Sequence, residues 1–152
     1  MKKNILFALA FVLIAAMACN DGKDKKAEGP QLTEEQKQLA LKDSANGTTI
    51  QWLDSTYQNV GKVKKGQSVE ISFRFKNTGD KPLIIAAVLP GCGCTVAEKP
   101  ETPILPGKED KIVAKFNSES QSVGSHQKNV TVQANTQPMP TTVLTFNVDV
   151  VE

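Results

Sequence analysis

Short segments in which apolar and polar residues alternate one by one make up most of the chain after Thr48. The clearest runs from Val69 to Phe75, where every second residue is apolar. A period of two places successive side chains on opposite faces of a β-strand, so such a segment buries one face. The same pattern, or a short apolar run, marks further strand candidates at 49–53, 57–60, 83–89, 112–116, 130–133 and 144–150.

Residues typical of turns separate these candidates. The stretch from Asn77 to Pro82, the Pro106-Gly107 pair and the stretch 137–140 contain the Asn, Gly and Pro residues that tight turns need. No long helical pattern interrupts the strands, which disfavours a parallel α/β sheet. About seven short strands within residues 48–152 predict an all-β chain folded as an immunoglobulin-like β-sandwich.

The first 18 residues have the layout of a bacterial signal peptide. Lys2 and Lys3 precede an apolar run that is shorter than the roughly 20 residues of a membrane helix. The sequence Ala16-Met17-Ala18-Cys19 resembles the lipobox of bacterial lipoproteins, in which the cysteine becomes the acylated first residue. An ordinary signal peptide cleaved nearby is the alternative. We expect acyl chains such as palmitate on Cys19 to hold the mature chain at a membrane.

Residues 19–47 are rich in charged and amide side chains and poor in large apolar groups, so we expect a mostly disordered tether. Thr33 and Gln36 match a capping box at the start of one short helix within it. A helix of this length is marginal in isolation. The predicted organisation is therefore a signal peptide (1–18), a lipidated tether (19–47) and one sandwich domain (48–152).

Composition and charge exclude several functions. The chain has 18 basic and 16 acidic residues, and loss of Lys2 and Lys3 with the signal peptide leaves the two numbers equal. With no basic patch interleaved with aromatics, nucleic-acid binding is not indicated. His126 is the sole histidine, and no serine elbow or phosphate-binding glycine loop accompanies it. The sequence therefore predicts a protein that is not an enzyme.

Two motifs carry a resemblance to a known family. Asn77-Thr78-Gly79 in its turn, followed by Gly91-Cys92-Gly93-Cys94-Thr95, is similar to the bacterial family called domain of unknown function 1573. Later segments agree, and the similarity extends over roughly residues 50 to 150. The resemblance implies an Ig-like fold in exported proteins, often lipoproteins of Bacteroidetes-type bacteria. It implies no activity, cofactor or partner.

Cys92 and Cys94 are the residues most suggestive of chemistry. In an extended chain their Cα atoms would be about 7 Å apart, at the limit for a disulfide, and Gly93 allows a turn that brings them closer. Three interpretations remain open. The pair is a disulfide or thiol pair that fixes the turn, a soft-metal site for Cu(I) or Zn(II), or a redox-active pair.

Simple sandwich order places the Cys92–Cys94 turn and the 117–125 connection at the same end, with Met139 at the other. A metal site would then comprise Cys92, Cys94 and His126, which we expect to lie in a loop. No other cofactor is indicated.

Two serines match a modification pattern. Asp43-Ser44-Ala45 and Asp54-Ser55-Thr56 resemble the acceptor sites of bacterial O-glycosylation, which makes Ser44 and Ser55 candidates.

The sequence as a whole favours a membrane-anchored binding or scaffolding module of the bacterial cell envelope, in the outer rather than the inner membrane. Its partner is expected to be an envelope protein or a glycan. A thiol-based metal-binding or redox protein is the alternative.

Overall fold

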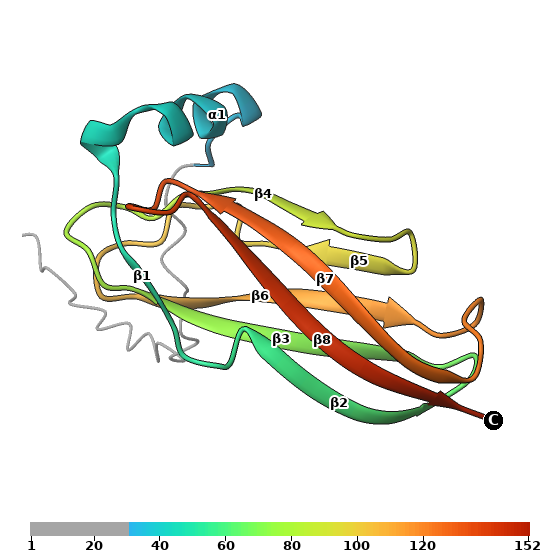
Figure 1. Ribbon diagram of the computed structural model, residues 1–152. Helices are drawn as coiled ribbons and strands as arrows, with labels where there is room; N and C mark the ends of the chain where they lie inside the picture. Colours follow the sequence, from blue (N-terminus) through green and yellow to red (C-terminus); the bar gives the residue numbers. More distant parts are fainter. Residues whose placement is uncertain (1–30) are drawn as a thin grey trace, which may run out of the picture.

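The two layers of a β-sandwich account for nearly all of residues 31–152, the part of the chain that the computed structural model describes (Figure 1). The first sheet contains, in spatial order, β1 (Ile50–Trp52), β3 (Ser68–Asn77), β6 (Glu109–Asn117) and β5 (Thr95–Glu98). The second contains β2 (Tyr57–Lys64), β8 (Thr141–Val151), β7 (Gly124–Ala134) and β4 (Ile85–Pro90). This confirms the predicted Ig-like sandwich, with eight strands in place of about seven.

The strand that the sequence did not predict is β5. Its four residues directly follow the cysteine motif and pair antiparallel with β6. An alternation of this length is too short to stand out from the flanking turn residues. All other neighbours in the sheets are antiparallel except β2 and β8, which run parallel. The second sheet thus joins an early strand to the last one.

The core consists of the apolar side chains that alternate inward from both sheets. Phe73, Phe75, Phe116 and Phe146 are fully buried, surrounded by aliphatic residues of every strand but β1 and β5. Phe116 and Phe146 meet edge to face across the sandwich, with ring centroids 6.0 Å apart. Trp52 on the edge strand β1 packs in the same way against Phe75. Burial of each large side chain contributes roughly 1.5–3 kcal/mol.

Buried asparagines connect the loops at one end of the sandwich. The Asn77 side chain accepts hydrogen bonds from Thr48 Oγ1 and Gly79 N and donates to the carbonyl oxygens of Lys81 and Ile104. Asn135 likewise donates to carbonyls of two separate loops and accepts from Ile84 N. Their amides satisfy backbone groups that the sheets leave unpaired.

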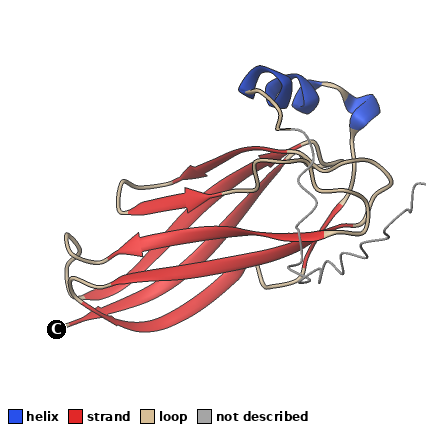
Figure 2. Cartoon of the chain, turned by 180° about the vertical axis from the view of Figure 1, so that it is seen from behind, coloured by secondary structure: helices blue, strands red, loops and turns tan. Residues whose placement is uncertain are grey.

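A helix, α1 (Glu34–Lys42), packs at the same end beside β4 (Figure 2). It begins with the predicted capping box, in which Thr33 Oγ1 and Gln36 exchange hydrogen bonds with each other's backbone N–H. Lys37 is 97% buried, and its ammonium contacts Glu34 and, 2.8 Å away, Glu101 in the loop before β6. The expected disordered tether is therefore wrong for residues 34–47, because a distant ion pair holds the helix against the domain.

Candidate functional site

The Cys92–Cys94 pair lies in the loop that passes from β4 in the second sheet to β5 in the first. The two sulfurs form a disulfide, with the Cα atoms 5.3 Å apart. Cys92 O accepts a hydrogen bond from Thr95 N, and Cys94 O accepts one from Asn117 N, 2.9 Å away. The loop is thereby attached to the end of β6. In this form neither sulfur is a free thiolate that could bind Cu(I) or Zn(II).

Of the two glycines in this motif, only Gly91 has a close neighbour, the Asn129 side chain. A Cβ added at Gly91 would lie 2.0 Å from Asn129 Oδ1, whereas a Cβ at Gly93 would meet nothing within 4 Å. Gly93 also lies outside the positive-φ region that favours glycine. The approach of Cys92 to Cys94 therefore does not depend on the special backbone freedom that the sequence suggested for Gly93.

His126 belongs to β7 and not to a loop, contrary to the sequence-based expectation. It pairs with Val148 of β8, and its Nε2 atom lies 2.7 Å from Ser122 O. Within residues 31–152, no three His, Cys, Asp or Glu side chains form a cluster that could hold a metal ion. The structure thus does not bring His126 together with Cys92 and Cys94 as a metal site.

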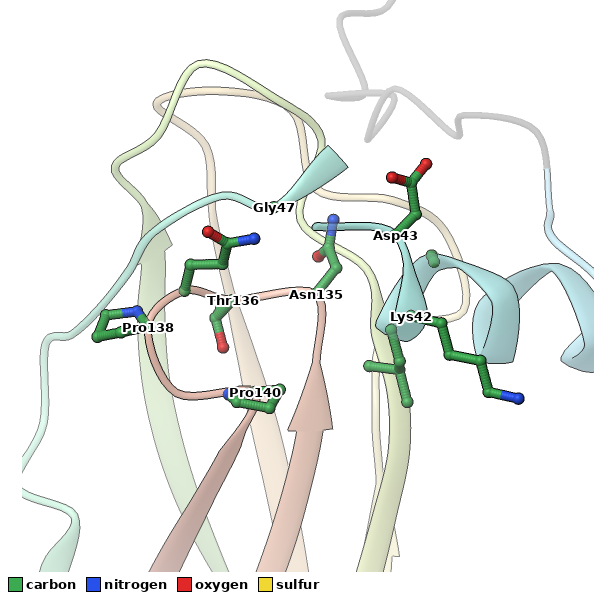
Figure 3. Close-up of a pocket in the computed structure, with 10 residues that line it drawn as sticks. Lys42, Asp43, Gly47, Asn135, Thr136, Pro138 and Pro140 are labelled. Atoms are coloured by element: carbon green, nitrogen blue, oxygen red, sulfur yellow. The ribbon is translucent and has the colours of Figure 1, made fainter. Parts of the chain in front are cut away.

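A shallow hollow borders the disulfide. It is lined by Cys92, Gly93, Cys94, Asn117, Glu119, Ser120, Gln121 and Lys128. The cysteine loop and the 117–121 segment share this end of the sandwich, as predicted, while Pro138 and Pro140 lie at the helix end (Figures 1 and 3). Lys128 Nζ donates to Gln121 Oε1 and lies 5.9 Å from the centroid of the Phe116 ring. Both cysteines are half-buried, so an external thiolate can reach the disulfide.

The double variant Cys92→Ser, Cys94→Ser is expected to lose little stability. A disulfide that closes a three-residue loop removes about 1.6 kcal/mol of unfolded-state entropy, compared with about 3 kcal/mol for a loop of 15 residues. Urea unfolding of the oxidised chain and of the double variant measures the difference. A loss above about 3 kcal/mol would show that the disulfide is the main stabilising element of this end of the sandwich.

A second hollow lies between α1 and the β7–β8 loop (Figure 3). Its polar lining already stabilises the loops, because Asn135 donates hydrogen bonds to neighbouring backbone carbonyls and Thr136 Oγ1 donates to Met139 O.

One predicted modification site lies before β1 and the other before β2. Ser44, one of the predicted glycosylation sites, lies in the 3-10 helix η1 (Ser44–Asn46). Ser55 is exposed before β2, and its Oγ accepts a hydrogen bond from Tyr57 N. Cys19 and the predicted signal peptide lie outside the described residues.

The outer face of the second sheet carries no charge over most of its length. The outward positions follow from the strand registers and the alternation of burial. They are Tyr57, Asn59, Ala87, Leu89, Ser125, Gln127, Asn129, Thr131, Gln133, Thr141, Val143, Thr145 and Asn147. Among the described residues of this face, the first charged ones are Lys62 and Asp149, at the end near the C-terminus. We call the uncharged part the neutral face.

The outer face of the first sheet differs sharply from the neutral face. Its outward residues include Glu70, Arg74, Lys76, Glu98, Glu109, Lys111 and Lys115. Lys115 Nζ lies 2.8 Å from Glu98 and 3.2 Å from Glu70, and the hydrogen bonds that the Lys115 ammonium donates to these carboxylates raise its pKa. Hydrogen bonds from Arg74 lower the pKa of the Asp54 carboxyl. The charges of this face are thus largely paired with one another.

These features define an Ig-like β-sandwich domain with a half-buried disulfide and two outer faces of contrasting charge. The chain belongs to the family described as protein of unknown function (DUF1573), which matches residues 50–150 and confirms the resemblance seen in the sequence. No curated protein sequence matches the chain. Within residues 31–152, no helix has the length and apolarity needed to cross a membrane.

Two solved structures share the fold. A protein of unknown function from Porphyromonas gingivalis W83 is 17% identical, with a TM-score of 0.62, over 70% of this chain and 49% of that one. The chain thus spans about half the length of that protein. The ASH/PapD-like domain 7 of human CEP192 is 9% identical, with a TM-score of 0.53, over 91% of this chain and 99% of that domain. Both are similar in fold alone.

Proposed function

We propose that the chain is a non-enzymatic binding or scaffolding module of the bacterial cell envelope, held at the outer membrane by a lipid on Cys19. The observation that carries this function is the neutral face. It exposes hydrogen-bonding amides and hydroxyls without the charges that cover the opposite sheet. Depletion of charge is typical of the centres of binding surfaces, since desolvating an unpaired charge is costly.

The disulfide supports a location outside the cytoplasm. Disulfides persist in oxidising compartments such as the bacterial periplasm and the cell surface, and are rare in the cytosol. The Cys92–Cys94 bridge therefore fits the export that the signal-like segment 1–18 predicts. Acylation of Cys19 would then leave the sandwich domain on the outside of a membrane without requiring a spanning helix.

Photo-crosslinking in intact bacterial cells tests the binding function. A photoreactive residue placed at Leu89, on the neutral face, is expected to give an adduct of higher mass. The matched control carries it at Lys111, on the outer face of the first sheet, and should give none. The crosslinker inserts into C–H bonds of any partner, so the result does not depend on the partner's chemistry. Equal labelling patterns from both positions would contradict a binding role for this face.

The variant Cys19→Ser is expected to move the chain from the membrane fraction to the soluble periplasmic fraction. Burial of each acyl methylene in the membrane contributes about 0.8 kcal/mol of binding free energy. Loss of the acyl chains therefore removes the anchor. Metabolic labelling with radioactive palmitate measures acylation, and cell fractionation measures location. A chain that stays unlabelled, or a variant that remains membrane-bound, would contradict the anchoring.

A redox protein is the second candidate, and the half-buried disulfide, which an external thiolate can reach, favours it. An external dithiol would reduce the Cys92–Cys94 bridge to two thiols and become a disulfide itself. The double serine variant separates the two functions. If the domain is a binding module, the double serine variant should leave crosslinking from Leu89 unchanged. If the domain is a redox protein, the variant should abolish its thiol–disulfide exchange with an external dithiol.

A further inference from the structure

The neutral face presents a regular array of unused hydrogen-bonding groups. The carboxamides of Gln127, Asn129 and Gln133 and the hydroxyls of Thr131, Thr141 and Thr145 point outward from the central strands β7 and β8. Within the described part of the chain, none of these six side chains has an intramolecular side-chain hydrogen bond. A carboxamide both donates and accepts, as a hydroxyl does. The array can therefore bind a partner that also carries donors and acceptors in every direction.

The spacing of this array suits an extended chain of hydroxyl groups. Neighbouring strands lie about 4.8 Å apart, and successive outward residues of one strand lie about 7 Å apart. The register places Thr131 between Leu89 and Val143, and Thr145 between Asn129 and Tyr57, in consecutive rows. Polar and apolar contacts thus repeat across the sheet at the scale of a sugar ring, which has hydroxyls at its rim and C–H groups on its faces.

Tyr57 supplies an aromatic surface at the margin of the array. It begins the edge strand β2, is 54% exposed, and pairs with Thr145 in the parallel register. A tyrosine ring offers a rigid apolar body with a polar tip. The C–H face of a sugar ring can pack on such a ring while its hydroxyls reach the neighbouring amides.

The same face is poorly suited to other classes of partner. An anionic polymer would find no cation among its described central residues. The buried centre of a protein interface is typically more apolar than the rest of the surface. Leu89 and Val143 are separated by Thr131, on strands two positions and therefore about 10 Å apart. Isolated apolar side chains among amides favour a hydroxyl-rich ligand over a protein.

We propose that the neutral face binds an uncharged polysaccharide chain, laid over β8 and β7 and packed at one margin against Tyr57. This inference rests on the proposed binding function and specifies the chemistry of its partner.

Affinity electrophoresis of the full chain, in native gels containing polysaccharide, tests this binding. Mannan, dextran and laminarin serve as uncharged probes and alginate as an anionic one. At least one uncharged polysaccharide is expected to retard the chain, and alginate is not. Thr131→Asp should raise the dissociation constant obtained from the retardation by about tenfold or more. The reason is that a carboxylate in the centre of the face must be desolvated without a counter-charge. Tyr57→Ala should raise this dissociation constant to a similar extent.

Ser72→Asp is the matched control. Ser72 occupies the corresponding place on the central strand β3, on the outer face of the first sheet, and is partly exposed as Thr131 is. It should leave retardation unchanged, and circular dichroism melts confirm that all variants fold. Failure of all three uncharged polysaccharides, binding of alginate alone, or equal effects of both substitutions would overturn the inference. A protein adduct from Leu89 with no polysaccharide binding would overturn the inference alone and leave the binding function in place.

Discussion

Replacing Asn77 by alanine is expected to lower the free energy of unfolding by about 3 kcal/mol. Its buried carboxamide makes four hydrogen bonds, at 2.7 to 3.1 Å, to Thr48, to Gly79 and to two backbone carbonyls. Alanine removes all four and leaves the buried Thr48 hydroxyl and the Ile104 carbonyl with fewer partners. Each unsatisfied buried group costs about 1–3 kcal/mol. Urea denaturation followed by tryptophan fluorescence measures the loss.

Thr78→Ala is the control for this substitution within the same motif. Thr78 is exposed, and among the described residues its hydroxyl hydrogen-bonds only with that of Thr49, also exposed. A surface change of this kind alters stability by about 0.5 kcal/mol or less. If Asn77→Ala costs no more than Thr78→Ala, the buried carboxamide does not hold the loops together.

The Asn-Thr-Gly motif, one of the two that carry the family resemblance, therefore has a structural role. Gly79 is required because an added Cβ would lie 2.1 Å from Thr48 Oγ1 and 2.8 Å from the backbone of Thr49. Asn77 and Gly79 together allow the β3–β4 turn to pack against the segment before β1. The residues that made the chain recognisable thus act in folding, and they say little about its ligand.

Local patterns were sufficient to predict the sandwich and every strand but β5, but not the contacts between distant segments. The capping box at Thr33 and Gln36 could be predicted because both residues lie within one turn. The docking of α1 could not, since it depends on Glu101, 64 residues after Lys37. A lysine in a polar stretch has the sequence pattern of a solvated residue whether or not a distant carboxylate meets it.

The neutral face shows the same limit. The alternation in 130–133 and 144–150 predicts which residues point outward from each strand. It does not predict that β2 lies parallel to β8, or that β4 borders β7. Only this order brings Tyr57, Val143 and Leu89 onto one surface with the uncharged residues of β7 and β8. The cysteine motif can be recognised in the sequence because its residues are adjacent, whereas the neutral face is assembled from four separate segments.

Lys37→Ala is expected to release and melt α1 while leaving the sandwich folded. The Lys37 ammonium lies 2.8 Å from both Glu34 and Glu101, and the hydrogen bonds that it donates to Glu101 and Glu34 raise its pKa. A helix of nine residues is not stable by itself in water, so its order depends on this attachment. Hydrogen exchange should show about tenfold or greater acceleration at the amides of residues 37–42, with those of β3, β6, β7 and β8 unchanged.

Lys42→Ala supplies the control for Lys37→Ala, because Lys42 is an exposed lysine in the last turn of the same helix. The two variants have the same intrinsic helix propensity, so a difference between them reports the buried ion pair. Lys42→Ala should cost only its interaction with the helix dipole, about 0.3–1 kcal/mol. Equal acceleration in both variants would show that apolar contacts with β4, and not the ion pair, hold the helix.

Acid should open α1 in the unmodified chain as Lys37→Ala does, but to a smaller extent. Hydrogen bonds from Lys37 lower the pKa of Glu101 and of Glu34 in the folded state. Carboxyl groups with a lowered pKa stabilise the folded state above the unfolded pKa, and this contribution is lost as the pH falls through the folded value. Both carboxylates are more than half exposed, so solvent screening keeps their effect modest. Exchange at residues 37–42 should therefore show greater opening below about pH 4 after correction for the intrinsic rate, and Lys37→Ala should abolish this dependence. A helix that opens equally at pH 3 and pH 7 would contradict the role of the ion pair.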